Sequence, residues 1–149
     1  SPPPPSSPSL PPPPPPPLPP SLSPPACTFT NTFTTKASLK TAVQAFDTNP
    51  TAAIVKYGPI ADWCVSAITD MSGLFSYLKN FDADVSNWDT SSVTNMYAMF
   101  RYASAFNQPL AFDTSSVTFM DAMLRYASAF NQPLSFDTSS VTKVNGMFY

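Results

Sequence analysis

The sequence predicts an α/β repeat fold, a solenoid of about 24-residue units that each contain a short strand, a turn and a short helix. The decapeptide RYASAFNQPL occurs at residues 101–110 and again at 125–134, 24 residues later. Aromatic residues recur at nearly the same spacing, at Trp63, Trp88, Phe112 and Phe136. A unit of this size cannot bury its apolar face alone, whereas stacked units form one continuous core.

The first residues are predicted to lie outside that core. Residues 1–25 contain 16 of the 20 prolines and otherwise only Ser and Leu. Because Pro lacks a backbone donor and fixes its own φ angle, we expect a disordered proline-rich tail in extended polyproline II form, on the order of 75 Å at full length. We interpret it as a linker, with a ligand for PxxP-binding domains and a glycosylated stalk as alternatives.

Residues 26–61 are predicted to cover the first unit as an N-terminal cap, because a repeat array otherwise exposes its first apolar layer. The segment TFTNTFTT, at residues 28–35, alternates polar and aromatic residues. This alternation predicts a half-buried strand that carries Phe29 and Phe33.

Two helical segments follow within the cap. Leu39, Val43 and Phe46 lie at helical spacing, Ser38 is the expected N-cap, and Asn49-Pro50 ends the helix. A second, shorter helical segment, TAAIVKYG, ends at Gly58.

Residues 62–149 are predicted to form the repeat array, with units near 63–87, 88–111 and 112–135 and a partial unit at 136–149. Within one unit, apolar residues at relative positions 0, 3, 6 and 7 would share an arc about 120° wide on a helix, and these residues are Val93, Met96, Met99 and Phe100. Leu110 and Phe112 lie two apart after Asn-Gln-Pro, which predicts a short strand.

Two segments resemble known families. The units ADVSNWDTSSVTNMYAMF and MFRYASAFNQPLAFDTSSVTFM, within residues 62–149, resemble the BspA-like leucine-rich-repeat surface proteins. That resemblance implies a right-handed solenoid of leucine-rich-repeat type, displayed on a cell surface or secreted, without catalytic activity and used for adhesion or ligand binding. SPPPP at residues 1–5 resembles the repeat of extensin-like, hydroxyproline-rich cell-wall glycoproteins, which implies a tail outside the cell.

Composition argues against several functions. The net charge is −2, and the five Lys and two Arg are scattered singly, so no basic stripe is present to bind nucleic acid. No apolar run reaches the roughly 20 residues of a membrane span. The chain starts at Ser1 without a leader and stops inside a repeat, so we expect it to be a piece of a longer protein.

Catalysis, cofactors and metals are not expected. The chain has no histidine and only three glycines, which leaves no Ser-His or Cys-His base and no phosphate-binding loop. Asp82 and Asp84 lie two apart and could form a pair of catalytic carboxylates on one face of a strand, but the later copies of this strand carry no such pair. One further set of aspartates opens each Asp-Thr-Ser-Ser-Val-Thr motif and is expected to cap turns rather than bind calcium, namely Asp89, Asp113 and Asp137.

Other recurring polar residues have predicted structural roles. The threonines that end the Ser-Val-Thr motifs and their equivalent in the first unit are interpreted as helix N-caps, namely Thr69, Thr94, Thr118 and Thr142. Asp82, Asn107 and Asn131 follow a buried Phe, and we expect a polar ladder that bonds the backbone of the next coil.

The candidate binding surface combines two sets of repeated residues. Arg101 and Arg125 form one column beside Tyr102 and Tyr126, and aromatic and Arg side chains commonly anchor binding surfaces. On the strand face, Gln108 and Gln132 should point away from the core. Structural stacking along the array is the alternative for the first set.

Cys27 and Cys64 are the only cysteines. In the extracellular setting that the tail implies, they could join the cap to the array and stabilise the fold by about 3 kcal/mol. Two buried free thiols, or a bond to another molecule, are the alternatives.

The sequence therefore predicts a non-enzymatic extracellular or cell-surface repeat protein that mediates adhesion by binding a protein or glycan ligand. A structural hydroxyproline-rich cell-wall glycoprotein is the alternative.

Overall fold

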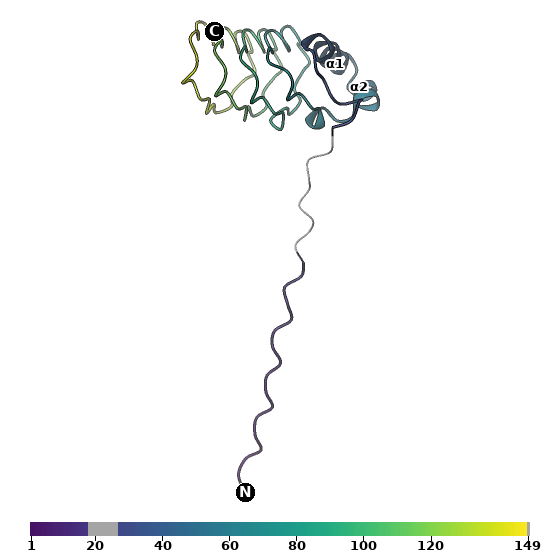
Figure 1. Ribbon diagram of the computed structural model, residues 1–149, viewed down its shortest axis with the longest axis vertical. Coiled ribbons are helices and arrows are strands. Elements are labelled where there is room, and N and C mark those ends of the chain that lie inside the picture. The colour runs from purple at the N-terminus through teal and green to yellow at the C-terminus, as the bar shows by residue number, and fades with distance from the viewer. Residues whose placement is uncertain (18–26, 149) are drawn as a thin grey trace.

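The computed structural model describes residues 1–17 and 27–148. Its folded part begins with two helices, α1 (Lys36–Thr48) and α2 (Pro50–Tyr57), and a short 3₁₀ turn, η1 (Ile60–Asp62). The chain then winds through successive coils that lie side by side (Figure 1). Residues 1–17 are exposed and form neither helix nor strand. The remaining residues of the predicted tail, 18–25, lie outside the described part.

The predicted α/β fold, a right-handed solenoid of leucine-rich-repeat type, is wrong. Described residues 63–148 contain no α-helix and no strand, and the segment predicted as a helix, 93–100, consists of irregular chain, a single bridge residue and a turn. The predicted strand at Leu110 and Phe112 is irregular chain. Isolated parallel bridges are the one sheet-like feature of this region, and they join Asp70 to Asn95, Asn95 to Phe119 and Phe119 to Lys143.

Left-handed residues explain why no helix forms. Ala98 has a φ angle of 51° and Tyr102 one of 61°. Each occupies the third position of a four-residue turn, closed by hydrogen bonds from Met99 N–H to Met96 C=O at 3.3 Å and from Ala103 N–H to Phe100 C=O at 3.0 Å. A positive φ at the third position is the mark of a type II turn and interrupts a right-handed helix. Turns that repeat every four residues place the same side chains inward as a helix would. The spacing of apolar residues therefore cannot distinguish a helix from such a series of turns.

Backbone hydrogen bonds join each coil to the next at alternate residues. In the first coil, the N–H groups of Met71 and Phe75 donate to the C=O groups of Asn95 and Met99, at 2.9 and 2.8 Å. The second coil repeats the pattern toward the third, for example from Phe100 to Met123 at 2.8 Å. Each coil therefore satisfies its backbone groups through its neighbours, as strands do in a parallel sheet.

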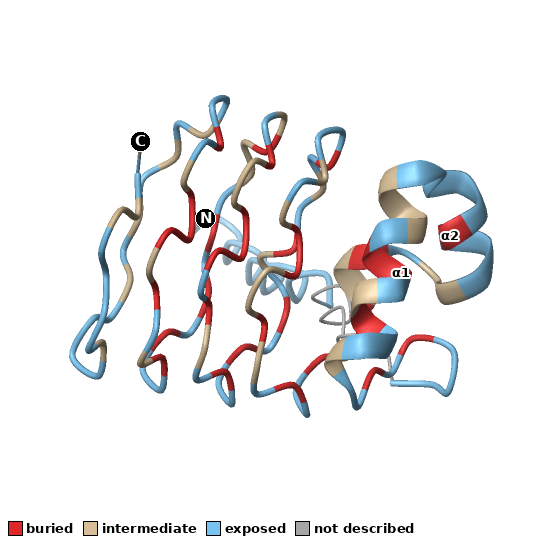
Figure 2. Ribbon diagram, turned by 90° about the horizontal axis from the view of Figure 1, so that it is seen from above, coloured by how far each residue is buried: buried red, intermediate tan, exposed pale blue. Residues whose placement is uncertain are grey.

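Equivalent core residues meet between coils, as the repeat predicted. The rings of Phe75 and Phe100 stack with centroids 4.8 Å apart, and those of Trp63 and Trp88 with centroids 6.2 Å apart. Buried residues line the inside of the coils, whereas their outer turns are exposed (Figure 2). One apolar core runs from the cap into the array, since Leu39 and Val43 of α1 belong to the same buried cluster as these rings.

The two helices of the cap are confirmed, with one difference. The N-cap of α1 is Thr35, whose side chain accepts the Ser38 N–H, so Ser38 itself lies inside the first turn. Asn49 ends α1 and also caps α2, where Pro50 stands at the first position and needs no donor. α2 ends at Gly58, whose φ angle is 77°.

The strand predicted at residues 28–35 is wrong. Only Thr32 pairs, in an isolated parallel bridge with Cys64. Phe33 is buried in the core as expected, but Phe29 is fully exposed. The segment lies close beside the first coil, and Cys27 and Cys64 form a disulfide with Cα atoms 5.8 Å apart.

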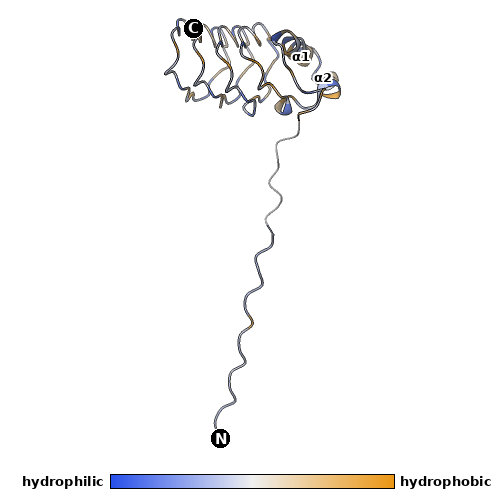
Figure 3. Cartoon of the chain, in the orientation of Figure 1, coloured by the Kyte–Doolittle hydropathy of each residue, from blue (hydrophilic) through white to orange (hydrophobic). Residues whose placement is uncertain are grey.

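Lysine side chains on α1 contact the first coil. Lys36 Nζ lies 3.4 Å from the Asp70 carboxylate and 2.6 Å from Ser72 Oγ. Lys40 Nζ donates to the Gly73 carbonyl at 2.8 Å, and its burial, with Lys36 nearby, lowers the pKa of Lys40. Polar and apolar residues mix along both helices (Figure 3), and no helix in the described residues is long and apolar enough to cross a bilayer.

Candidate functional site

Aspartates at the corners of the coils cap turns, as predicted. Asp89 Oδ1 accepts the Ser91 N–H at 3.1 Å and the Ser91 hydroxyl at 2.6 Å, and Asp113 does the same with Ser115. The hydroxyl and N–H of Ser91 hold the pKa of Asp89 below its ordinary value. Asp137 accepts the Ser139 N–H at 2.9 Å. In the described residues, no group of three possible metal-ligating side chains is close enough to hold an ion.

The repeated threonines are not helix N-caps, because no helix follows them. The Thr94 hydroxyl donates to the Thr69 carbonyl at 3.2 Å, while the Thr94 N–H donates to the same carbonyl at 2.8 Å. Thr118 and Thr142 each bond the threonine of the preceding coil in the same way. These side chains therefore connect coils.

The predicted polar ladder is confirmed. The Asn107 N–H donates to Asp82 Oδ1 at 2.9 Å, and the Asn131 N–H donates to Asn107 Oδ1 at 2.8 Å. Gln108 and Gln132 join the same ladder, since their amides donate to Asp82 and to Asn107. Two residues of the candidate binding surface thus make contacts between coils. Because Asp82 belongs to the ladder and Asp84 caps Ser86, these two carboxylates have structural roles.

The tyrosine column is a continuous stack. Tyr77 and Tyr102 have ring centroids 4.7 Å apart, and Tyr102 and Tyr126 have theirs 4.6 Å apart. The guanidinium carbon of Arg101 lies 5.2 Å from the Tyr102 ring centroid, and that of Arg125 lies 5.0 Å from the Tyr126 centroid. The stack is partly exposed, but its ring faces are largely occupied by one another.

The residues joined by the parallel bridges, Asp70, Asn95, Phe119 and Lys143, form one column, which we call the bridge column. A recess is lined in part by this column and by Arg125. Its volume is about 550 Å³. We call it the Phe119 recess, and it is lined by Asn95, Tyr97, Phe119, Asp121, Ala122, Arg125, Lys143 and Asn145. Of the six residues proposed from sequence as a binding surface, Arg125 alone lines this recess.

Two aromatic rings in the recess are exposed. Tyr97 is 46% exposed and Phe119 is 39% exposed. The Lys143 ammonium lies 5.6 Å from the Phe119 ring centroid. Around the rings, Asn95 Oδ1 accepts the Tyr97 N–H at 2.9 Å, and Asp121 Oδ1 accepts the Asn145 N–H at 3.1 Å. Two polar side chains are thereby fixed in place.

The sequence does contain a signal for this recess, namely a short segment in which two otherwise nearly identical repeats differ. Residues 101–118 and 125–142 are identical except at positions 111 and 135. The six residues that follow them, FMDAML at 119–124 and KVNGMF at 143–148, share a single Met. Inward positions in these segments stay apolar, whereas the outward positions change from Phe to Lys and from Asp to Asn. A search for differences between the copies, rather than for identities, would have found it.

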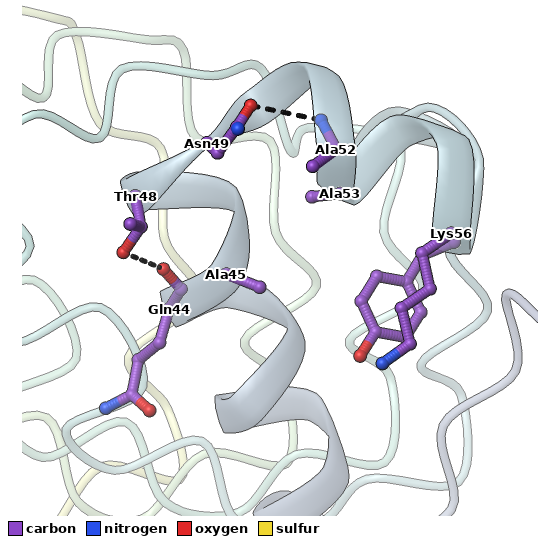
Figure 4. Close-up of a pocket in the computed structure, with 8 residues that line it drawn as sticks. Gln44, Ala45, Thr48, Asn49, Ala52, Ala53 and Lys56 are labelled. Atoms are coloured by element: carbon purple, nitrogen blue, oxygen red, sulfur yellow. Dashed lines mark hydrogen bonds between the residues drawn. The ribbon is translucent and has the colours of Figure 1, made fainter.

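A second hollow lies between α1 and α2 (Figure 4). It has a volume of about 410 Å³, and alanines form much of its lining, with Lys56 at one end. Two of its polar side chains bond locally: the Thr48 hydroxyl donates to the Gln44 carbonyl, and Asn49 Oδ1 accepts the Ala52 N–H. This hollow offers methyl groups but few groups that could orient a ligand.

The family described as "Mycoplasma protein of unknown function, DUF285" matches residues 44–149. The chain belongs to this family. The match covers the coils, α2 and the end of α1, and it is consistent with the resemblance to BspA-like surface proteins. No curated protein and no solved structure matches the chain.

Proposed function

We propose that this DUF285 chain is a non-enzymatic binding module that mediates adhesion outside the cell, and that the Phe119 recess and the exposed residues around it are its recognition surface. The outward positions of the bridge column carry Asp70, Asn95, Phe119 and Lys143 in successive coils. The fold tolerates an anion, an amide, a ring and a cation at one equivalent place, so packing does not dictate which residue stands there.

The residues around this column behave differently. The threonine, asparagine, glutamine and tyrosine columns repeat because each residue bonds to or stacks on a residue of a neighbouring coil. A change of chemical class at the outward positions of one column, on a scaffold whose other contacts repeat, is the observation that carries the proposal. Repeat proteins commonly bind through such an extended face.

The extracellular location is supported by the disulfide between Cys27 and Cys64, because disulfides form and persist mainly in oxidising compartments. The exposed proline-rich residues 1–17 are suited to hold the folded part away from whatever carries it.

Adhesion of coated beads tests the proposal. Beads that carry the full chain are passed over immobilised extracellular-matrix proteins, mucins and cell-wall polysaccharides, and retention under flow is measured. At least one surface should retain them, and the double variant Tyr97→Ser/Phe119→Asn should reduce retention about fivefold or more. Equivalent positions of other coils carry these same residues, Ser72 and Asn95, so the variant should fold.

The matched control is Phe29→Ser, which removes an exposed ring far along the chain from the recess. Retention on none of the surfaces, or retention that the double variant leaves unchanged, would contradict the proposed function.

A further inference from the structure

We infer that the Phe119 recess binds a pyranose-containing glycan, with the rings of Phe119 and Tyr97 packing against sugar C–H groups. The inference rests on the proposed function and specifies the ligand class of the same surface.

Phe119 occupies a place where the fold favours a different residue. In the first coil, Asp70 Oδ1 accepts the Ser72 N–H at 2.8 Å, and in the second, Asn95 Oδ1 accepts the Tyr97 N–H at 2.9 Å. Phe119 has no oxygen to make this turn-capping bond, and its ring is 39% exposed. The third coil therefore lacks a stabilising hydrogen bond and exposes an apolar ring, a combination that serves a ligand better than it serves the fold.

Hydrogen-bonding atoms surround the two rings. Asn95 and Asp121 each use one oxygen to accept a backbone N–H, which restricts their rotation. Asn95 Nδ2, Asp121 Oδ2 and the Asn145 amide group have no hydrogen-bond partner among the described residues. Planar amide and carboxylate groups held in place can pair with neighbouring sugar hydroxyls, since each offers donors or acceptors in fixed directions.

The shape and the charges favour a sugar over a hydrophobic peptide anchor. The recess measures about 550 Å³ and is open, and its rings stand beside polar groups instead of forming an enclosed apolar slot. Such a surface suits a ligand that has both C–H faces and many hydroxyls. Lys143 lines the same recess, and its ammonium group can donate to ring or hydroxyl oxygens.

Isothermal titration of the full chain tests the inference. The probes are tetrasaccharides of glucose, mannose, galactose and galacturonic acid. At least one should bind, with Phe29→Ser unchanged and Tyr97→Ser/Phe119→Asn weakened about tenfold or more. Circular dichroism and the thermal midpoint should show that both variants remain folded, and Phe119→Asn should restore the turn cap.

Mild periodate, which cleaves vicinal diols of sugars and leaves polypeptide intact, separates this inference from the proposed function. If oxidation of the retaining surface abolishes bead retention, the glycan inference is supported. If no tetrasaccharide binds and retention survives periodate but is lost after protease treatment, the ligand is a protein; the glycan inference then fails while the proposed function stands. If no surface retains the beads, both fail.

Discussion

Non-glycine residues with positive φ angles fall into two columns of the described chain. Ala98 and Ala122 share a column with Gly73 and Gly146, and the three tyrosines of the stack form the other. A left-handed residue with a side chain costs roughly 1–2 kcal/mol relative to glycine. The tyrosines offset part of this cost by stacking, since stacked aromatic pairs contribute about 0.5–1.5 kcal/mol each.

Gly73→Ala tests this backbone strain. An added Cβ would meet only the Ser76 Cβ, at 4.0 Å, so the change adds strain without a clash. We expect a folded protein whose free energy of unfolding falls by about 1 kcal/mol, measured by urea denaturation. Ser66→Ala, at an exposed turn position, is the control and should change stability by less than about 0.5 kcal/mol. A loss of several kcal/mol for Gly73→Ala would show that the position cannot hold alanine as Ala98 and Ala122 do.

The capping aspartates predict how stability depends on pH. Hydrogen bonds from Ser91 and Ser115 hold the pKa values of Asp89 and Asp113 below their ordinary value of 3.8. As the pH falls, these aspartates take up protons at a higher pH in the unfolded chain than in the folded one. The stabilisation is therefore present above about pH 4 and is lost as the pH falls through the lower pKa values of the folded state. We expect the thermal unfolding midpoint to decrease as the pH is lowered from about 4 to about 2.

The double variant Ser91→Ala/Ser115→Ala is the comparison for this experiment. Without the two hydroxyls, the pKa values of Asp89 and Asp113 should rise toward 3.8 and the acid-induced fall should become shallower. An acid dependence identical to that of the unchanged chain would mean that these hydrogen bonds contribute nothing to stability.

At the scale of elements, α1 acts as the cover of the first coil. Leu39 is fully buried, and it belongs to the core cluster that contains Phe75. Leu39→Ala removes most of this buried side chain, and we expect the free energy of unfolding to drop by about 2–5 kcal/mol in urea denaturation. Thr41→Ala changes an exposed residue of the same helix and should have a much smaller effect. Equal effects for the two variants would mean that α1 does not close the core.

Sequence alone could predict some elements and not others, for physical reasons. The helices α1 and α2 follow from local signals, such as Asn49-Pro50 and Gly58, that act within a few residues. The segment around Met96 and Met99 lacks such signals. There the choice between helix and turns depends on whether the N–H groups bond within the segment or to the next coil.

The site was predictable only in part. The repeated residues Tyr102, Gln108 and Gln132 stood out in the sequence because they recur, yet they recur because they stack on or bond their neighbours. Apart from Arg125 and Ala122, the residues of the Phe119 recess do not repeat, so their proximity emerges only once coils 24 residues apart are laid against each other.

At the scale of the whole molecule, the disulfide joins the segment before α1 to the first coil. Cys27 and Cys64 are 37 residues apart, a separation for which loop entropy predicts a stabilisation of roughly 4 kcal/mol. Cys27→Ser/Cys64→Ser should therefore lower the urea midpoint clearly. The unchanged chain under a reducing agent should show the same shift, and no shift in either case would show that α1 and the core hold the cap without the covalent link.

Hydrogen bonds between coils also give the stack a direction. In the bonds between backbone groups of the first two coils, the N–H groups of Met71, Gly73, Phe75 and Tyr77 donate forward, while that of Thr94 donates backward. The two ends of the pile are therefore chemically unlike, in the way that the ends of a polar filament are. A coil turned over onto its neighbour would set most donors against donors, or acceptors against acceptors, so successive coils bond well only when all of them run the same way.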